Sequence, residues 1–138
     1  MARNHVEINS TALTRQLQRA MRRNPTVTTK TVRDIALDLA GRSARRAPVD
    51  TGDLRNNCSA TVNGSEVFKN QTACGTVNPS RRVEAEVGYS LPYALRQHEE
   101  LNYNHPKGGE AKFLENPYLE NEERYIRKLK AIPEEVFE

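Results

Sequence analysis

The residues most suggestive of chemistry are Asp50, Thr51 and Gly52, because Asp-Thr-Gly is the catalytic triplet of aspartic proteases. Such an enzyme holds two carboxylates close together at the floor of a cleft, where they share a proton. That arrangement needs apolar strands around the triplet, whereas here Pro48 precedes it and the polar segment 53–57 follows it. We therefore interpret the triplet as a structural turn. Pro48 ends a helix, Asp50 caps backbone amides, and Gly52 tolerates positive φ.

A second group of candidate residues consists of His98, Glu99, Glu100 and His105. Side chains of these types bind zinc. Neighbouring residues point in different directions on a helix or a strand, however, and the zinc signature of two histidines four apart, with a glutamate after the first, is absent. We favour an exposed or interfacial loop, and we expect no metal and no other cofactor.

The two cysteines, Cys58 and Cys74, fall in predicted strands without a nearby histidine to act as a base. Nucleophilic catalysis is therefore not indicated. A disulfide and two separate thiols both fit the spacing, and a reducing compartment favours two small buried thiols. The Gly108-Gly109 pair is too short for a phosphate-binding loop.

The size and composition of the chain favour one modest domain. It has 138 residues, 36% of them hydrophobic and 28% charged, and it lacks tryptophan. We expect a single domain over residues 1–138, with residues 1–9 and 132–138 as flexible or partner-bound ends. Neither a signal peptide nor an apolar run of about 18 residues is found, so we expect the protein to stay in the cytosol or in something assembled there.

The charge is polarised along the chain. Residues 1–48 contain ten Lys or Arg against three acids, a net of +7, while residues 110–138 contain five against eight, a net of −3. This asymmetry favours an acidic partner such as nucleic acid, or head-to-tail contact between copies of the chain.

Three segments have the apolar periodicity or the end signals of helices: residues 10–23, residues 29–46 and a segment that begins at Asn116. We expect the first helix to end at Asn24-Pro25, since proline removes a backbone donor and disfavours helical geometry in the residue before it. The third helix opens with a capping residue followed by proline, which is the favoured order.

The first helix is predicted to carry a basic face opposite its apolar residues. That face consists of Arg15, Arg19, Arg22 and Arg23. It could contact DNA phosphates or another acidic partner, but basic helix faces are commonly just solvated, and nothing in the chain resembles a base-reading module.

After Gly52 the apolar period changes from 3.6 to 2, which indicates strands. Residues 58–62 alternate between apolar and polar types, Asn63-Gly64 is a strong signal for a two-residue turn, and residues 65–69 would return along the first strand. We expect a β-hairpin here.

Further strands are predicted over residues 72–77 and 81–89, followed by a helical turn or bent strand at 91–98 and an exposed loop at 99–110. The second of these strands has the clearest alternation, and its expected buried face consists of Val83, Ala85, Val87 and Tyr89. The predicted fold is α+β: N-terminal helices packed on an antiparallel sheet of about four strands, with a C-terminal helix.

Three motifs stand in order along the chain: RRAPVDTGDLR at 45–55, VGYSLPYALRQHE at 87–99 and GGEAKFLE at 108–115. Together they resemble the tail-completion or minor capsid proteins of long-tailed double-stranded DNA bacteriophages, over roughly residues 35 to 120. Many members of that family have proline before the Phe-Leu pair and arginine soon after it, where this chain has Lys112 and Glu115.

This resemblance implies a structural, non-enzymatic protein of the virion neck, the joint between head and tail. Members of the family assemble as rings around the DNA channel and contact head-closure, tail-terminator or tail-tube proteins. We expect a homo-oligomeric ring of six copies that is assembled in the host cytoplasm and lies close to the genomic DNA. The alternatives are a tail terminator that caps the tail tube and a small basic DNA-binding module.

Apolar and aromatic residues beside the predicted 99–110 loop are the candidates for subunit contacts, because burial between subunits would stabilise them most. They are Tyr93, His98, Leu101, Phe113 and Leu114. For Phe113 and Leu114, packing onto the chain's own core is an equally good interpretation.

Overall fold

The structure is a computed structural model, and it describes residues 10–48, 53–91, 94–99 and 112–136. Its helices are α1 (Thr11–Arg23), α2 (Pro25–Arg46), α3 (Asp53–Asn57), α4 (Ala94–Glu99) and α5 (Glu115–Lys130). Its strands are β1 (Ser59–Val62), β2 (Ser65–Lys69), β3 (Thr72–Ala73) and β4 (Ala85–Gly88). The expected α+β class, with an antiparallel sheet and a C-terminal helix, is confirmed.

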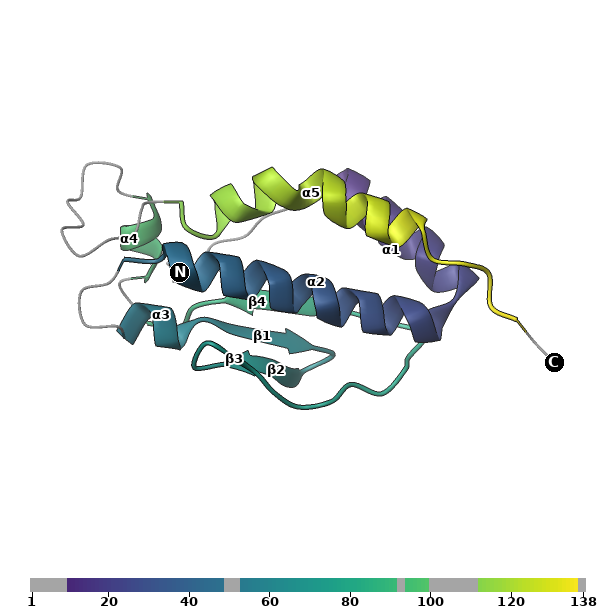
Figure 1. Cartoon of the computed structure of the whole chain (residues 1–138), viewed down its shortest axis with the longest axis horizontal. Helices are drawn as coiled ribbons and strands as arrows, with labels where there is room; N and C mark the ends of the chain where they lie inside the picture. The colour runs from purple at the N-terminus through teal and green to yellow at the C-terminus, as the bar shows by residue number, and fades with distance from the viewer. Residues whose placement is uncertain (1–9, 49–52, 92–93, 100–111, 137–138) are drawn as a thin grey trace, which may run out of the picture.

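The elements form layers, and the long helix α2 lies in the middle one (Figure 1). The sheet covers one side of α2, and the helices α1 and α5 cover the other. Within the described residues the sheet has four strands in the order β3-β2-β1-β4, and every pairing is antiparallel. Because α2 is covered from both sides, its apolar residues cannot form a single stripe.

Local capping chemistry sets the boundary between α1 and α2. Ser10 is the N-cap of α1, and its hydroxyl accepts the N–H of Leu13 at 3.1 Å. Asn24 ends α1 and caps α2, because its side-chain oxygen accepts the N–H of Val27 at 3.1 Å. We expected the second helix to begin at Thr29, but it begins at Pro25, since proline fits the first turn of a helix, where its missing N–H is not needed.

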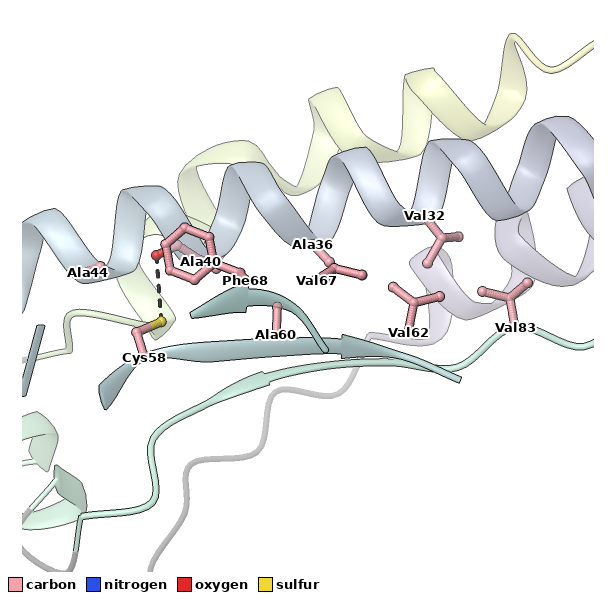
Figure 2. Packing of buried hydrophobic residues seen from close by; sticks show 10 residues of the cluster. All are labelled: Val32, Ala36, Ala40, Ala44, Cys58, Ala60, Val62, Val67, Phe68 and Val83. Atoms are coloured by element: carbon pink, nitrogen blue, oxygen red, sulfur yellow. Dashed lines mark hydrogen bonds between the residues drawn. The ribbon is translucent and has the colours of Figure 1, made fainter. Parts of the chain in front are cut away.

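The predicted hairpin is present as β1 and β2. The turn residues Asn63 and Gly64 have φ values of 52° and 80°, the left-handed geometry that a two-residue hairpin turn requires. The register between the strands shifts after Ala60, and the result is a β-bulge. The bulge places the side chains of the adjacent residues Val67 and Phe68 on the same face of the sheet, toward α2 (Figure 2).

The other two strands are shorter than predicted. β3 covers only Thr72–Ala73, and β4 only Ala85–Gly88. Side chains of other elements hold the intervening chain in place of a strand ladder: Arg33 donates to the Cys74 and Gly75 carbonyls. The Asn63 side chain holds the chain before β4 in a similar way. Its amide group donates to the Arg82 carbonyl, and its oxygen accepts the Glu84 N–H.

The predicted buried face of the last strand is only partly correct. Val83 is buried, and Val87 and Tyr89 are half-buried. Ala85 is exposed, and it lies on β4, which is an edge strand of the sheet.

The main core lies between α2 and the sheet. Small residues spaced four apart on α2, namely Ala36, Ala40 and Ala44, face larger side chains of the strands (Figure 2). The other side of α2 contributes Ile35 to a second cluster with α1 and α5. α2 is therefore buried from two directions.

The chain ends are less free than we expected. α1 and α5 run parallel, since Ser10 bonds to the Glu122 carboxylate at 2.7 Å near one end and Arg23 bonds to the Leu129 carbonyl at 2.8 Å near the other. After α5, Ile132 is buried, and the N–H of Glu135 donates to the Arg23 carbonyl at 2.9 Å. Residues 132–135 belong to an end that we predicted to be flexible or partner-bound, and these contacts with α1 argue against flexibility there. Residues 1–9 and 137–138 lie outside the described part of the chain.

Candidate functional site

The three motifs of the sequence converge at the end of the molecule where α2 stops. Ala47 and Leu54 of the first motif, Ala94 of the second and Phe113 of the third form one buried cluster, against which Tyr89 packs. α3, α4 and the start of α5 lie at the same end (Figure 1). The ring of Phe113 packs edge-on against Tyr89, with 5.0 Å between ring centroids. We call this the junction cluster.

His98 connects the junction cluster to the start of α5. Its ring is fully buried and packs edge-on against Phe113, with centroids 5.1 Å apart. Its Nε2 atom accepts the backbone N–H of Glu115 at 3.2 Å, so the imidazole caps a helix whose N-cap residue, Leu114, makes no side-chain cap bond. Its Nδ1 atom lies 2.9 Å from the Glu99 carboxylate. This pairing requires the neutral tautomer with the proton on Nδ1.

Charged residues surround this cap at the surface. Lys112 pairs with both the Glu99 and the Glu115 carboxylates. The hydrogen bond from Lys112 holds the pKa of Glu99 below its ordinary value. Burial lowers the pKa of His98, and the adjacent Glu99 only partly opposes this effect. His98 is therefore neutral at pH 7 and acts as a hydrogen-bond acceptor.

The structure contradicts part of the predicted subunit interface. His98, Phe113 and Leu114 are 0%, 1% and 4% exposed, so their side chains pack within the chain and offer no surface to a neighbour. The core-packing interpretation of Phe113 and Leu114 is the correct one, because the aromatic rings of Tyr89 and His98 enclose Phe113. Tyr93 and Leu101, the other two candidates, lie outside the described residues.

The predicted turn after α2 is seen only at its beginning. Ala47 has the extended geometry expected before proline, with φ −63° and ψ 146°, and Pro48 is buried. Arg55 donates to the Ala47 carbonyl at 2.8 Å and so fixes α3 to the end of α2. Asp50 and Gly52 lie outside the described residues.

The buried polar groups of this region are poorly suited to nucleophilic chemistry. Both cysteines are free thiols, but only Cys58 is buried as expected, and Cys74 is half-buried. Burial raises the pKa of the Cys58 thiol to about 11. The Tyr89 hydroxyl bonds to Ser43 at 2.7 Å, and burial raises the pKa of Tyr89 as well. Within the described residues, no group of three or more His, Cys, Asp or Glu side chains could hold a metal ion.

The basic face of α1 is present, but with three arginines instead of four. Arg15, Arg19 and Arg22 are exposed. Arg23 is half-buried and donates to the carbonyls of Leu129 and Ile132, at 2.8 and 3.0 Å, so it caps the last turn of α5. The prediction for Arg23 is wrong. Arg22 and Arg23 are adjacent on α1, but only the side chain of Arg23 reaches the end of α5. We call Arg15, Arg19 and Arg22 the α1 stripe.

The sheet also carries an acidic surface that was not predicted from the sequence. Thr61 in the central strand β1 is directly opposite Glu66 of β2 on one side and Glu86 of β4 on the other. Opposed residues in antiparallel strands project from the same face, so the three side chains form a row across the sheet on the face away from α2. Both glutamates are exposed. The alternation of residues 83–87 predicts that the Glu86 side chain is exposed to solvent. Only the register of the strands shows that Glu86 lies in one row with Glu66.

Comparisons of the chain with protein-family models, with curated proteins and with solved structures find no match. Among the described residues, no helix is long and apolar enough to cross a membrane.

Proposed function

We propose that this chain is a structural, non-enzymatic subunit of the neck of a long-tailed double-stranded DNA bacteriophage. Copies of it would form a ring around the DNA channel of the virion and would complete or attach the tail. The proposal starts from the sequence resemblance carried by residues 45–55, 87–99 and 108–115.

The observation that carries the proposal is the role of these motifs in the fold. Their described apolar and aromatic residues meet in the junction cluster, where Phe113 packs against Tyr89 and His98 caps α5. These side chains stabilise the meeting point of α2, α3, α4 and α5. Motifs that serve packing are expected in a structural subunit, whereas a catalytic site would hold reactive groups open to a substrate.

The surface of the molecule gives independent support for self-assembly. The α1 stripe is basic and exposed, the open face of the sheet carries Glu66 and Glu86, and the two surfaces belong to different layers. A subunit with two different complementary surfaces forms heterologous contacts, which close into a ring when the rotation between copies allows it. The neighbours in the neck would be head-closure, tail-terminator or tail-tube proteins.

A second candidate function is a small DNA-binding module, and the α1 stripe favours it because α1 contains no acid that would repel phosphates. A third, a tail terminator, would share the ring form and differ in its position on the tail.

Mass measurement of the purified chain, with electron microscopy of the chain and of phage particles that contain it, tests these functions. A ring located at the head–tail joint is the expected result. A ring at the end of the tail tube would favour the terminator. A monomer that binds duplex DNA, with an affinity that falls steeply as salt rises, would favour the DNA-binding module.

A further inference from the structure

We propose that the α1 stripe of one copy docks on the open face of the sheet of the next copy. The contact would pair Arg15, Arg19 and Arg22 with Glu66 and Glu86, and it would be the heterologous contact that builds the oligomer. This inference rests on the proposed function, because it names the surfaces through which the ring would form.

The sheet offers a face that no element of the described residues covers. α2 packs against the opposite face, where Ala60, Val62, Val67 and Phe68 are buried. On the open face Glu66, Thr61 and Glu86 lie in one row, and Ser59 and Gly88 form the neighbouring pair of β1 and β4. These small residues leave the row accessible from solvent. The one base that the paired strands add to this face is Lys69, at the far end of β2.

The α1 stripe is a matching convex surface. The exposed residues of α1 recur at helical spacing and include Thr11, Thr14 and Gln18 besides the three arginines. α1 has no acidic residue in its first turn or elsewhere in its sequence TALTRQLQRAMRR. Its other side packs on α5 and α2 through Leu17, Ala20 and Met21. The stripe is therefore presented rigidly, because the helix that carries it is held from behind.

The spacings of the two charged surfaces agree. Glu66 and Glu86 are two strands apart, which is about 9.6 Å at the usual strand separation of about 4.8 Å. Arg15 and Arg22 are seven residues apart on one side of a helix, which is about 10.5 Å at about 1.5 Å per residue. A helix laid across the strands of a neighbouring sheet would thus place one arginine near each glutamate, with Arg19 between them over Thr61.

One chain cannot make this contact with itself. α2 lies between the sheet and the layer that contains α1, so the stripe and the open sheet face are on different sides of the molecule (Figure 1). Each copy would use its stripe on one neighbour and its sheet on the other. A closed ring is the arrangement that leaves neither surface uncovered.

The test uses charge reversal in the full chain. One variant, Glu66→Arg with Glu86→Arg, makes the sheet face basic; the other, Arg15→Glu with Arg19→Glu, makes the stripe acidic. We expect each variant alone to need a protein concentration for assembly that is higher by about tenfold or more, because each juxtaposes like charges. Native mass spectrometry and sedimentation over a concentration series measure the shift.

Mixing the two variants gives the decisive result. In the mixture the basic stripe of the first variant meets the acidic sheet of the second, and the acidic stripe of the second meets the basic sheet of the first. Assembly should return, with the two variants alternating in oligomers of even size. Neither general destabilisation nor loss of another surface would give this rescue.

Matched reversals elsewhere serve as controls. Glu123→Arg and Lys128→Glu change the charge at exposed positions of α5, and they should leave assembly unchanged. If the wild-type chain forms rings that the reversals do not affect, the docking surfaces are wrong and the neck proposal stands. If the wild-type chain remains a monomer at every concentration, both the docking surfaces and the neck proposal are wrong. Loss of duplex DNA binding in the stripe variant, with assembly intact, would assign the stripe to DNA instead.

Discussion

The carboxylate of Asp38 on α2 accepts a hydrogen bond from the hydroxyl of Tyr125 on α5, with 2.6 Å between the oxygens. The same carboxylate oxygen accepts from Arg42 at 2.9 Å and from Arg124 at 2.5 Å. Burial alone would raise the pKa of Asp38, but the hydrogen bonds from Tyr125 and the two arginines outweigh it and hold the pKa below the ordinary value. This group joins the middle helix to the outer layer.

Replacing Asp38 with Asn should destabilise the fold by about 2 kcal/mol at pH 7, because the hydrogen bonds from Arg42 and Arg124 lose their negatively charged acceptor. Urea denaturation measures the free energy of unfolding. The control is Asp34→Asn, the same change at an exposed position on α2, which should stay within about 0.5 kcal/mol of wild type. If the two changes lowered the free energy of unfolding equally, Asp38 would not have the structural role that its contacts indicate.

The contribution of Asp38 should depend on pH in a defined direction. Its pKa is lowered in the folded state, so its stabilisation is complete above the unfolded pKa of about 3.9 and is lost as the pH falls through the lower folded value. The difference between wild type and Asp38→Asn should therefore be constant from pH 7 to pH 5 and shrink below about pH 4. A difference that instead grew on acidification would contradict this assignment.

His98 should titrate below the ordinary histidine pKa of about 6.5, because burial disfavours its charged form and Nε2 is occupied by the Glu115 N–H. Since the folded pKa is depressed, the stabilisation from His98 is complete above about pH 6.5 and is lost as the pH falls through the folded value. NMR titration of the ring protons gives the pKa directly.

The matched variant is His98→Phe, which keeps an aromatic ring beside Phe113 but cannot accept the Glu115 N–H. We expect a loss of about 1–3 kcal/mol at pH 7.5, the usual cost of an unsatisfied buried donor. The loss should become smaller at acid pH, where the wild-type imidazole is protonated. A His98 ring that titrates above pH 6.5 would show that the cap is absent.

Two glycines with positive φ should respond differently to the same substitution. A Cβ on Gly75 would lie 2.4 Å from the Glu66 carbonyl oxygen, whereas a Cβ on Gly64 would meet no atom within 4 Å. Gly64→Ala should cost about 1 kcal/mol from backbone strain alone. Gly75→Ala should cost clearly more, because the backbone of β2 or of the segment after β3 must also move. Thermal unfolding of both variants measures the contrast, and equal losses would argue against the close approach.

The adjacent arginines of α1 provide another matched pair. Arg23→Ala should destabilise the chain by about 1–3 kcal/mol, because it removes two hydrogen bonds to the carbonyls of Leu129 and Ile132. Arg22→Ala, at an exposed position, should change stability by less than about 0.5 kcal/mol. Hydrogen exchange should show faster opening of the last turn of α5 in the first variant only. Similar exchange in both would mean that Arg23 does not cap the helix.

Features governed by neighbouring residues could be predicted from the sequence. Ser10 caps α1 because its hydroxyl reaches a backbone N–H three residues away, and α1 ends at Asn24, as expected. Asn63 and Gly64 form the hairpin turn because few residues accept positive φ. These interactions lie within a few residues of chain, so composition and spacing are enough to find them.

Features set by distant partners could not be predicted in this way. Helical periodicity places Arg22 and Arg23 on the same basic face. Only the position of α5 shows that Arg22 is exposed to solvent whereas Arg23 caps α5. The bulge that buries both Val67 and Phe68 breaks the two-residue period on which strand prediction depends. The acidic row of the sheet depends on strand register, which pairs Thr61 with residues of two other strands.

The parallel pairing of α1 with α5 has a consequence for how the chain folds during synthesis. α2 and the sheet come from one continuous part of the sequence, so they can pack as soon as that part has left the ribosome. The partners Ser10 and Glu122 are 112 positions apart, so this contact of α1 cannot form until residue 122 has been made. Until α5 is made, the part of α2 that packs against it stays open to solvent, and α1 is held only by its contacts with α2. Translation thus delays the full support of α1 until α5 has been made.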